Sequence, residues 1–400
     1  MRLSREATGS VLITIAMQIS VALTIASIQV SAPTIAYNQS LDVRWIGPFV
    51  AGCYAVAMVL SLLAGSVVLR WGAIRSAQIC LITAGGAAAL FASGRPSAML
   101  LSMLGFGIAL GLAVPASSQL IARHTGGREL PLAMSIGQSG MTMGRLTAGL
   151  AVPSLVLLVG WSHTLIAWSA LAVALAVALE GPRRRLDPSS TRFHKVSRRG
   201  IGEPLRMVRA NSALLRLAFA SIVFASAQLS LVVYLVTYMH EEAGLSLIIA
   251  GLAFALAQAA GIGNRFLVGG VASAIGRPRL VLSLLGFGMA VTLAGAAAVS
   301  PGWPTALVLL GAILLGSMAM SWNGLLFTEV IRAAGIGQAA TATGAVSFIT
   351  FIGLALGPAV FGALLALGGS YASGFLVFSG LVLAASIVIL PRARIATEIP

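Results

Sequence analysis

The sequence predicts an all-α membrane protein in which 12 transmembrane helices form two pseudo-symmetric six-helix bundles. Of the 400 residues, 58% are hydrophobic and 9% are charged, and the mean hydropathy is +0.99. A soluble protein usually carries about 25% charged residues, so this composition is typical of a chain that crosses a membrane repeatedly. Two further observations support the fold class. Apolar segments recur along the whole chain, and a basic block divides them near its centre.

The apolar segments fall into two equal sets on either side of the basic block. A helix needs about 20 residues to cross the hydrocarbon core of a bilayer. The first segment follows Arg2 and Arg5 but is longer than the ~7–15 apolar residues of a signal peptide, so we expect a retained helix. The predicted segments are 11–36, 46–69, 77–93, 97–122, 132–159 and 162–180, then 213–239, 247–273, 280–299, 304–327, 339–367 and 370–390.

Positive charge predicts the orientation of these helices. Ten of the 25 Lys and Arg residues lie within residues 183–216. With the N-terminus inside, 21 of the 25 fall in cytoplasmic segments, whereas only Arg44 and Arg95 lie outside. We therefore expect both termini to be cytoplasmic. The expected domains are an N-terminal bundle (1–182), a cytoplasmic basic connector (183–212) and a C-terminal bundle (213–400).

The same reasoning assigns the basic block to the membrane surface. Once the block is a cytoplasmic connector, a nucleic-acid partner is not expected, and anionic membrane lipid is the natural contact. Lys195 is the only Lys in a chain rich in Arg, Ala and Gly, which favours a bacterial protein of the inner membrane. Cys53 and Cys80 lie in apolar segments without metal-ligand spacing, so we expect neither a metal nor another cofactor.

The two halves also share short patterns. Gly65, Gly72 and Arg75 follow the second segment, and Gly269, Gly276 and Arg279 repeat their spacing 204 residues later. Gly111 in the fourth segment corresponds to Gly316 in the tenth at a shift of 205. Parallel six-helix repeats joined by a long cytoplasmic loop are one known architecture of transporters.

These patterns resemble the major facilitator superfamily, and the resemblance covers essentially the whole chain. In the loop between the second and third helices, Gly65, Arg70 and Gly72 match the family motif, but Leu69 stands where the family has an acid and Ala73 where it has Arg. The resemblance implies that this acid latches the two halves in one state. In the second half, Ser273 stands where the acid would be. The resemblance therefore implies a gating motif at Gly65, Arg70, Gly72, Gly269, Gly276 and Arg277.

The fifth segment is rich in glycine. The stretch from Gly137 through Gly140, Gly144 and Gly149 to Pro153 resembles the fifth helix of the family, best known in drug exporters. The eleventh segment has a comparable run over residues 353–362. Small residues at these intervals let helices approach closely and slide, and plain helix packing is the alternative explanation.

Acidic residues are missing from the interior of the predicted helices. All ten Asp and Glu residues and all four His residues fall in loops, tails or helix ends. A proton relay inside the membrane is therefore not evident, and hydrolytic or metal chemistry lacks its bases and ligands. We expect a protein that is not an enzyme.

Two arginines lie within predicted helices, and they carry the hypothesis about function. Arg145 lies near the middle of the fifth segment and Arg265 in the eighth. A guanidinium in the membrane costs at least ~2.5–3.5 kcal/mol, so it should face a wet cavity or an anion. Without an intramembrane carboxylate, the substrate is the remaining counter-ion, and the planar fork of Arg suits a carboxylate. The spacing from Arg265 to Gly269 also resembles carboxylate carriers of the superfamily, in which this Arg binds the anion. The alternatives are a side chain bonded to helix-end carbonyls for Arg265 and an inter-helix hydrogen bond for Arg145.

Other polar residues in the apolar segments could complete a binding cavity. The choice among them rests on the resemblance, because the family lines its path with the corresponding helices. Each of them could equally make a hydrogen bond between helices. The predicted substrate-binding residues besides the two arginines are Gln29, Gln138, Asn264, Tyr234 and Asn323.

The sequence thus predicts a secondary active transporter that moves a small organic anion, most simply a carboxylate, by alternating access. The coupling partner would be a proton, as is usual in the family, or a counter-anion, and we expect a monomer. The alternative is an efflux pump for drugs or amphipathic compounds, which the glycine-rich fifth segment favours. A membrane receptor would need a soluble signalling domain, for which the loops are too short.

Overall fold

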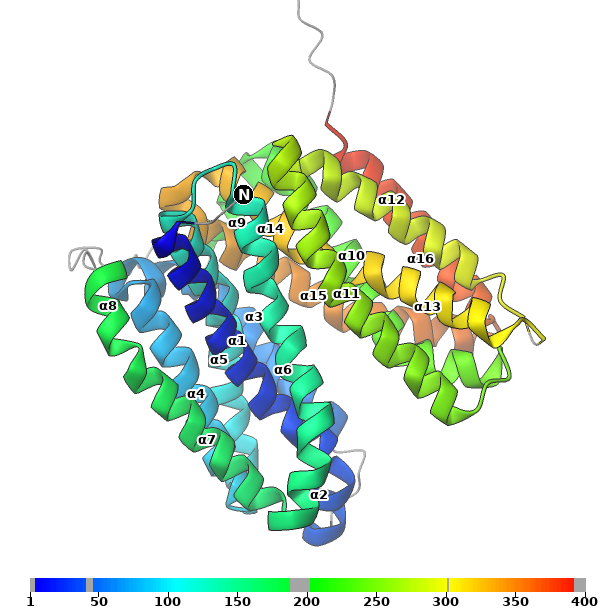
Figure 1. Ribbon diagram of the computed structural model, residues 1–400, viewed down its shortest axis with the longest axis horizontal. Coiled ribbons are helices and arrows are strands. Elements are labelled where there is room, and N and C mark those ends of the chain that lie inside the picture. The colour runs from blue at the N-terminus through cyan, green and yellow to red at the C-terminus, as the bar shows by residue number, and fades with distance from the viewer. Residues whose placement is uncertain (1–3, 41–45, 188–201, 301, 392–400) are drawn as a thin grey trace, which may run out of the picture.

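The computed structural model describes residues 4–40, 46–187, 202–300 and 302–391, and its regular elements there are helices (Figure 1). Twelve helical stretches in this part of the chain are long and apolar enough to span a membrane, which confirms the predicted number of spans. The helices are α1 (Arg5–Val30), α2 (Ala32–Gln39), α3 (Ile46–Trp71), α4 (Ala73–Ala92), α5 (Pro96–His124), α6 (Leu130–Val159), α7 (Trp161–Ala178), α8 (Glu180–Leu186), α9 (Gly202–Ala210), α10 (Ser212–Glu241), α11 (Leu247–Ile275), α12 (Pro278–Ala296), α13 (Thr305–Ala319), α14 (Trp322–Ala334), α15 (Ala339–Ala366) and α16 (Tyr371–Ile389).

Two spans differ from their predicted form. The first begins at Arg5, because the Oγ of Ser4 accepts a hydrogen bond from the backbone N of Ala7 and caps the helix. It ends at Val30, and Pro33 lies in the first turn of the short α2, where its missing N–H is tolerated. The tenth span is interrupted at Met320 and Ser321, so that α13 and α14 together cross the membrane.

The helices form two bundles that are built in the same way (Figure 1). In the first bundle α1 packs on α6 and α3 on α5; in the second, α10 packs on α15 and α11 on α13. Glycines occupy equivalent contacts: a Cβ at Gly111 would lie 2.7 Å from the carbonyl oxygen of Ala57, and one at Gly316 would lie 2.3 Å from that of Ala257. The corresponding packing confirms the pseudo-symmetry that the repeated spacings predicted.

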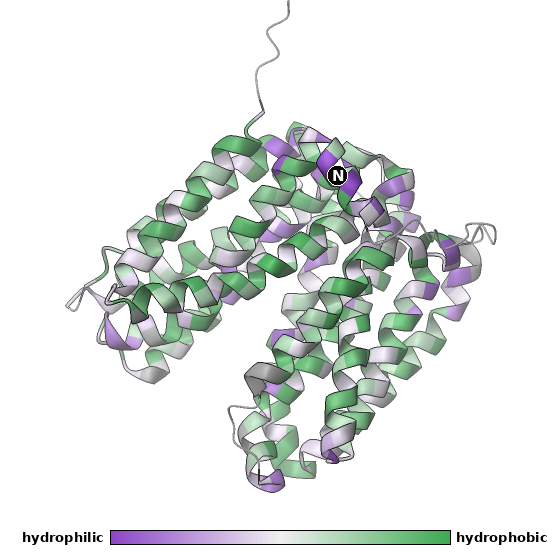
Figure 2. Ribbon diagram, turned by 180° about the vertical axis from the view of Figure 1, so that it is seen from behind, coloured by the Kyte–Doolittle hydropathy of each residue, from purple (hydrophilic) through white to green (hydrophobic). Residues whose placement is uncertain are grey.

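The bundles meet at one end and diverge toward the other (Figures 1 and 2). The end at which they meet, here called the closed end, carries the start of α1 and the end of α16 (Figure 1). Its main contacts between bundles are those of α3 with α15 and of α6 with α11. The diverging end, here called the open end, carries α2 and the turn between α15 and α16 (Figure 1).

The outer faces of both bundles are apolar (Figure 2). Leu157, Leu158 and Val291 expose 88%, 79% and 71% of their surface. Large exposed apolar areas of this kind are unfavourable in water and are explained by contact with lipid. The protein is therefore an integral membrane protein that crosses the bilayer many times.

The chain passes from one bundle to the other through α8 and α9. Just after α8, the buried carboxylate of Asp187 accepts a hydrogen bond from the backbone N of Ile74 at 3.1 Å and pairs with Arg123 at 2.7 Å. This contact fixes the beginning of the connector to the first bundle. Residues 188–201 of the predicted basic connector lie outside the described residues, as do Arg2, Arg44, Arg392 and Arg394, which entered the prediction of orientation.

Candidate functional site

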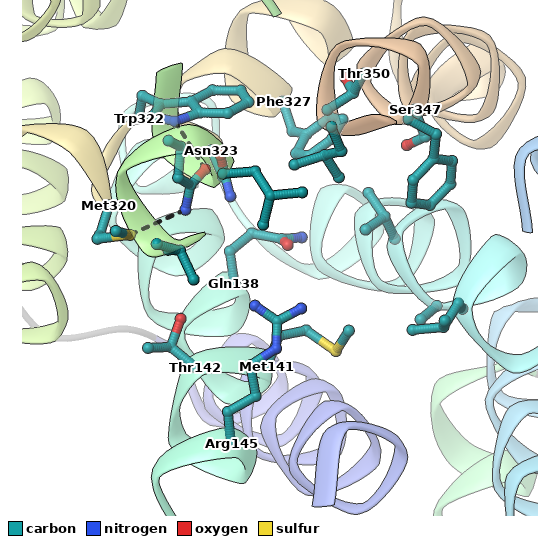
Figure 3. A pocket seen from close by; sticks show the side chains of 18 of the residues that line it. Gln138, Met141, Thr142, Arg145, Met320, Trp322, Asn323, Phe327, Ser347 and Thr350 are labelled. Carbon is teal, nitrogen blue, oxygen red and sulfur yellow. Dashed lines mark hydrogen bonds between the residues drawn. The ribbon is translucent and has the colours of Figure 1, made fainter. Parts of the chain in front are cut away.

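A cavity of about 140 Å³ lies between the two bundles, with walls from both (Figure 3). It is bordered by α3, α5 and α6 on one side and by α10, α11, α15 and the interrupted tenth span on the other. The lining residues are Tyr54, Leu110, Ala113, Val114, Gln138, Met141, Thr142, Arg145, Gln228, Leu229, Val232, Gln258, Arg265, Met320, Trp322, Asn323, Phe327, Ser347, Thr350, Phe351 and Leu354.

One face of α6 supplies the polar wall of the first bundle. Gln138, Met141, Thr142 and Arg145 are spaced by three, four and seven residues, which places them on one side of a helix. Figure 3 shows the amide of Gln138 and the guanidinium of Arg145 directed into the same space. The helix can turn this face toward the cavity because glycines on α6 let it approach α1: a Cβ at Gly144 would lie 2.5 Å from the carbonyl oxygen of Ile19.

Arg145 is an exposed residue that lines the cavity, and few groups near its guanidinium stabilise the positive charge. Its Nη2 donates a hydrogen bond to the hydroxyl of Tyr54 at 3.3 Å, near the long limit for such a bond. The ring of Tyr54 in turn lies 5.9 Å from that of Phe351, between centroids, which links α3 to α15 across the two bundles. Arg145 is therefore positioned by a neutral partner rather than neutralised by a carboxylate.

Arg265 lies on the other side of the cavity and is only 2% exposed. Its Nε donates to the carbonyl oxygen of Met320 at 2.7 Å, and its Nη1 donates to that of Gln138 at 2.6 Å. The first bond lies within the second bundle and the second crosses to the first. Carbonyl bonding was the alternative explanation for Arg265, and the structure shows such bonds at a residue that also borders the cavity.

The interruption of the tenth span brings further groups to the cavity. Where the helix stops, its carbonyls lose their usual partners. Arg265 binds one of them, and the Nδ2 of Asn264 donates to the carbonyl oxygen of Ser317 at 2.8 Å. Directly after the break, Trp322 and Asn323 line the cavity, and the indole of Trp322 donates to the Oε1 of Gln228 at 3.1 Å.

The lining is cationic. Among the described residues, it holds two arginines and no Asp, Glu, Lys or His. Several of its polar atoms are buried without a hydrogen-bond partner, namely the Nε2 of Gln138, the Oε1 of Gln258, the Oδ1 of Asn323 and the Oγ of Ser347. In the part of the chain that the structure describes, no three His, Cys, Asp or Glu side chains gather as a metal site would require. The cavity therefore suits an anion that also offers hydrogen-bonding groups.

Four of the seven predicted binding residues border the cavity: Arg145, Arg265, Gln138 and Asn323. The other three lie elsewhere. Gln29 is exposed near the end of α1, Asn264 supports the interruption of the tenth span, and the hydroxyl of Tyr234 donates to the carbonyl oxygen of Pro358 at 3.2 Å. The lining residues outside that selected set include Tyr54, Met141, Thr142, Gln228, Gln258, Trp322, Ser347 and Thr350, of which Tyr54, Gln228, Gln258 and Trp322 were among the polar candidates that the sequence offered.

Helical spacing could have found some of these missed residues. Met141 and Thr142 lie between Gln138 and Arg145 on the same face of α6, and Gln258 precedes Arg265 by two helical turns on α11. The residues of α15 carry no comparable signal, because no charged side chain marks which face of that helix is turned inward.

The predicted gating motif lies at the closed end. A Cβ at Gly65 would lie 2.6 Å from the Cα of Thr341 on α15, and one at Gly269 would lie 2.7 Å from the Cβ of Ser135 on α6. Both glycines thus permit close contacts between the bundles. Gly72 and Gly276 have positive φ angles of 88° and 72°, which favour glycine where α3 and α11 end. Arg70 and Arg277 are exposed at this end.

A neutral hydrogen bond stands at the position of the missing acid in the second half. The Oγ of Ser273 accepts from the backbone N of Leu132 at 3.0 Å. Leu132 lies in the first turn of α6, where backbone N–H groups lack partners within the helix. Nearby, the backbone N of Ala340 at the start of α15 donates to the Oε1 of Gln119 on α5 at 3.2 Å. At the closed end, the hydroxyl of Ser273 and the amide oxygen of Gln119 therefore accept hydrogen bonds from the first turns of α6 and α15.

Comparison with known structures gives the same fold. The E. coli fucose:proton symporter FucP has a TM-score of 0.77 at 15% identity, over 96% of this chain and 98% of that chain. The human organic anion transporter MFSD10 has a TM-score of 0.76 at 16% identity, over 96% and 100%. The proton:xylose symporter XylE has a TM-score of 0.69 at 16% identity, over 96% and 95%. No curated protein sequence is detectably similar to this chain.

The sequence itself matches the family model of the Major Facilitator Superfamily over residues 14–358. That match covers well over half of the 400 residues and extends from the first bundle into α15 of the second. With twelve candidate spans, two bundles of equivalent packing and a cavity between them, the chain belongs to the major facilitator superfamily of transporters.

Proposed function

We propose that this chain is a secondary transporter that binds a small organic anion, most simply a carboxylate, in the cavity between its bundles. The observation that carries the proposal is the charge of the lining: two guanidinium groups and no carboxylate. Like charges that share a site of low dielectric repel each other, and an anion bound between them relieves this repulsion. The family resemblance alone would not distinguish an anion from a sugar.

The two arginines have different roles in this proposal. Arg145 anchors the anion, because its single 3.3 Å bond to Tyr54 leaves most of its donors free. Arg265 adds positive charge to the cavity. It also stabilises the cavity wall, because two of its nitrogens donate hydrogen bonds to the carbonyl oxygens of Met320 and Gln138. A carboxylate on Arg145 would gain charge-assisted hydrogen bonds, each contributing about 1.5–3 kcal/mol.

The arrangement of the bundles supports alternating access as the mode of transport. The positive-inside rule places the closed end in the cytoplasm, so this structure would be open toward the outside of a bacterial inner membrane. Rocking of the bundles would break the contacts at the closed end and expose the cavity on the other side. The protein would work as a monomer and without catalysis of a chemical reaction.

The coupling partner is proposed to be a proton or a second anion. The lining contains no side chain that would carry a proton near neutral pH, which favours exchange of one anion for another. Among the structural neighbours, MFSD10 is described as an organic anion transporter, whereas FucP and XylE are described as proton symporters of sugars. Both coupling modes are compatible with this fold.

Drug efflux, the alternative prediction, receives no specific support. Its motivation was the glycine-rich α6, and these glycines have a packing role: Cβ atoms at Gly140 and Gly144 would lie 3.0 and 2.5 Å from backbone oxygens of α1. A cavity with two arginines and no carboxylate is also unfavourable for cationic drugs.

Uptake into proteoliposomes tests the proposal. The assay would compare radiolabelled mandelate, phenylacetate, gluconate and hexanoate with the neutral sugar xylose. We expect uptake of at least one acid but not of xylose. The variant Arg145→Met should lower the efficiency of uptake about 10- to 150-fold, which corresponds to one lost charge-assisted bond.

Arg95→Met is the matched control, because it makes the same change at an exposed residue just before α5, outside the cavity lining. This variant should retain uptake. Transport of xylose alone, or equal uptake by Arg145→Met and the control, would contradict the proposal.

A further inference from the structure

We propose that four side chains form a latch that holds the two bundles together at the closed end. The latch consists of Gln119, Arg128, Ser273 and Arg332, with the hydrogen bonds that they make to the opposite bundle. None of the four belongs to the predicted gating motif. The inference rests on the alternation between two conformations that is part of the proposed function, but it does not depend on the substrate.

Hydrogen bonds join the two bundles in the part of the chain that the structure describes. Five side-chain hydrogen bonds among these residues cross from one bundle to the other, whereas the four ion pairs each lie within a single bundle. One of the five is the bond from Arg265 to Gln138 at the cavity. The other four lie at the closed end, so separation of the bundles there must break them together.

Two of these bonds are made to the starts of helices. Ser273 accepts from the backbone N of Leu132 on α6 at 3.0 Å, and Gln119 accepts from that of Ala340 on α15 at 3.2 Å. Because a backbone N–H can only donate, the second bond also fixes the orientation of the Gln119 amide. The helices α6 and α15 hold equivalent places in the two bundles, since α6 packs on α1 and α15 on α10. The two bonds therefore follow the pseudo-symmetry of the fold.

The other two bonds are made by arginines. The Nη2 of Arg128 donates to the carbonyl oxygen of Ala274 at 3.4 Å, and the Nη2 of Arg332 donates to that of Gly127 at 2.8 Å. Ala274 lies in the last turn of α11, where carbonyl groups lack partners within the helix. The two arginines are 204 residues apart, as are the glycines of the repeated patterns. Each bundle thus contributes one arginine that binds a backbone carbonyl of the other.

The acceptors that bind the helix starts are neutral. Leu69 stands where the family motif has an acid and cannot accept a hydrogen bond, so α5 supplies the acceptor through Gln119. In the second half, Ser273 itself stands at the position of the acid. A neutral acceptor binds an N–H group about half as strongly as a carboxylate does. Such a latch favours one conformation and still releases in every transport cycle.

Double electron–electron resonance between spin labels at the open end tests the latch in the full-length protein without substrate. The labels are placed on Tyr37→Cys and Leu367→Cys, whose parent residues expose 87% and 86% of their surface. Loss of the latch opens the closed end, so the distance between the labels should shorten. In Ser273→Ala and in Gln119→Met, the ratio of closed to open conformations at the closed end should fall about 2- to 12-fold, as one lost neutral hydrogen bond would produce. The two sites share no partner, so the double variant should show the product of both changes.

Matched controls make the same substitutions within one bundle. The buried Ser283 donates to the carbonyl oxygen of Ser386 at 2.7 Å, and the buried Gln78 donates to that of Ala176 at 2.9 Å. Ser283→Ala and Gln78→Met therefore remove comparable bonds that do not join the bundles. Their Tm should fall, but the distance between the labels should stay as in the parent protein.

Arg332→Met tests the arginine side of the latch, and the distance between the labels should shorten in the same way. Arg332 also pairs with Glu329 at 3.7 Å on the same helix. Glu329→Gln is the matched control, because it removes this ion pair and keeps the bond from Arg332 to Gly127. The control should retain the distance of the parent protein.

The outcomes distinguish the latch from the proposed function. Thermal melting identifies the folded variants. If Ser273→Ala, Gln119→Met and Arg332→Met keep the parent distance when folded, or if the controls shorten it equally, the latch is wrong. Uptake that depends on Arg145 would then leave the proposed function standing. Conversely, a transporter of another substrate would show the same label distances, so a failed uptake assay would not overturn the latch.

Discussion

A methyl group added at the closed end should hold the bundles apart there. Gly344 on α15 approaches α3 so closely that a Cβ would lie 2.3 Å from the backbone oxygen of Ser61, against 3.4–4 Å in an ordinary contact. A backbone oxygen within a helix cannot turn aside, so Gly344→Ala is incompatible with this contact. When the closed end opens, the two helices separate and the overlap disappears. The substitution therefore destabilises one conformation of the transporter and not the other.

The expected size of the effect follows from the overlap of about 1 Å. Overpacking of this kind typically costs about 1–3 kcal/mol. Because 1.4 kcal/mol corresponds to a factor of ten, the ratio of closed to open conformations at this end should fall about 5- to 150-fold. Gly269→Ala should act in the same direction, since its Cβ would lie 2.7 Å from that of Ser135 on α6.

Double electron–electron resonance measures distances between spin labels and can detect this shift. Labels on Gly127→Cys and Gly337→Cys report on the closed end, where both residues are exposed on different bundles. Labels on Tyr37→Cys and Leu367→Cys report on the open end, where these residues expose 87% and 86% of their surface. In Gly344→Ala the first distance should lengthen and the second should shorten.

Gly270→Ala is the matched control for Gly269→Ala. The two glycines are neighbours on α11, but a Cβ at Gly270 would have no atom within 4 Å. Its label distances should equal those of the parent protein. If Gly344→Ala and Gly269→Ala also leave both distances unchanged, then the contacts of the closed end do not control the conformation of the transporter.

Three further predictions concern the anchor, the connector and the packing within one bundle. Tyr54→Phe removes the hydroxyl that positions Arg145, so the dissociation constant of a bound acid should rise about 2- to 10-fold in calorimetry; an unchanged constant would show that the 3.3 Å bond does not matter. Asp187→Asn weakens the buried 2.7 Å pair with Arg123 and should lower the stability of the detergent-purified protein by about 1–3 kcal/mol, seen as a lower Tm. A Tm of Asp187→Asn equal to that of the parent protein would contradict a role for this pair. Gly353→Ala should also lower the Tm, because its Cβ would lie 2.3 Å from a backbone oxygen of α10 in the same bundle, but the label distances at both ends should stay as they are.

The amino-acid sequence was sufficient to predict the spans and their grouping. Apolar length is a local property, and the cost of exposing an unpaired backbone to lipid leaves a helix as the structure of each apolar segment. Repeated glycine spacings, such as Gly111 and Gly316, also anticipated the equivalent packing of the two bundles. Assigning the other cationic residues to loops and tails left Arg145 and Arg265 as the two to explain, and both border the cavity.

The interruption of the tenth span could not be predicted from its apolar sequence. Residues 319–323 read Ala-Met-Ser-Trp-Asn, without a proline or glycine to mark a break. The break is stabilised by partners from another helix, because Asn264 and Arg265 of α11 bind carbonyls that it frees. A local pattern does not contain this information.

What the sequence alone determined about this protein is which segments cross the membrane and which charges remain inside them. What only the tertiary structure decided is which faces of the helices meet. Gln138 and Gln29 are both glutamines in apolar helices, yet the first borders the cavity and the second is exposed. The rotation of each helix about its axis is set by packing with helices distant in the chain, and Arg145 and Arg265 share one cavity because the two bundles close upon each other.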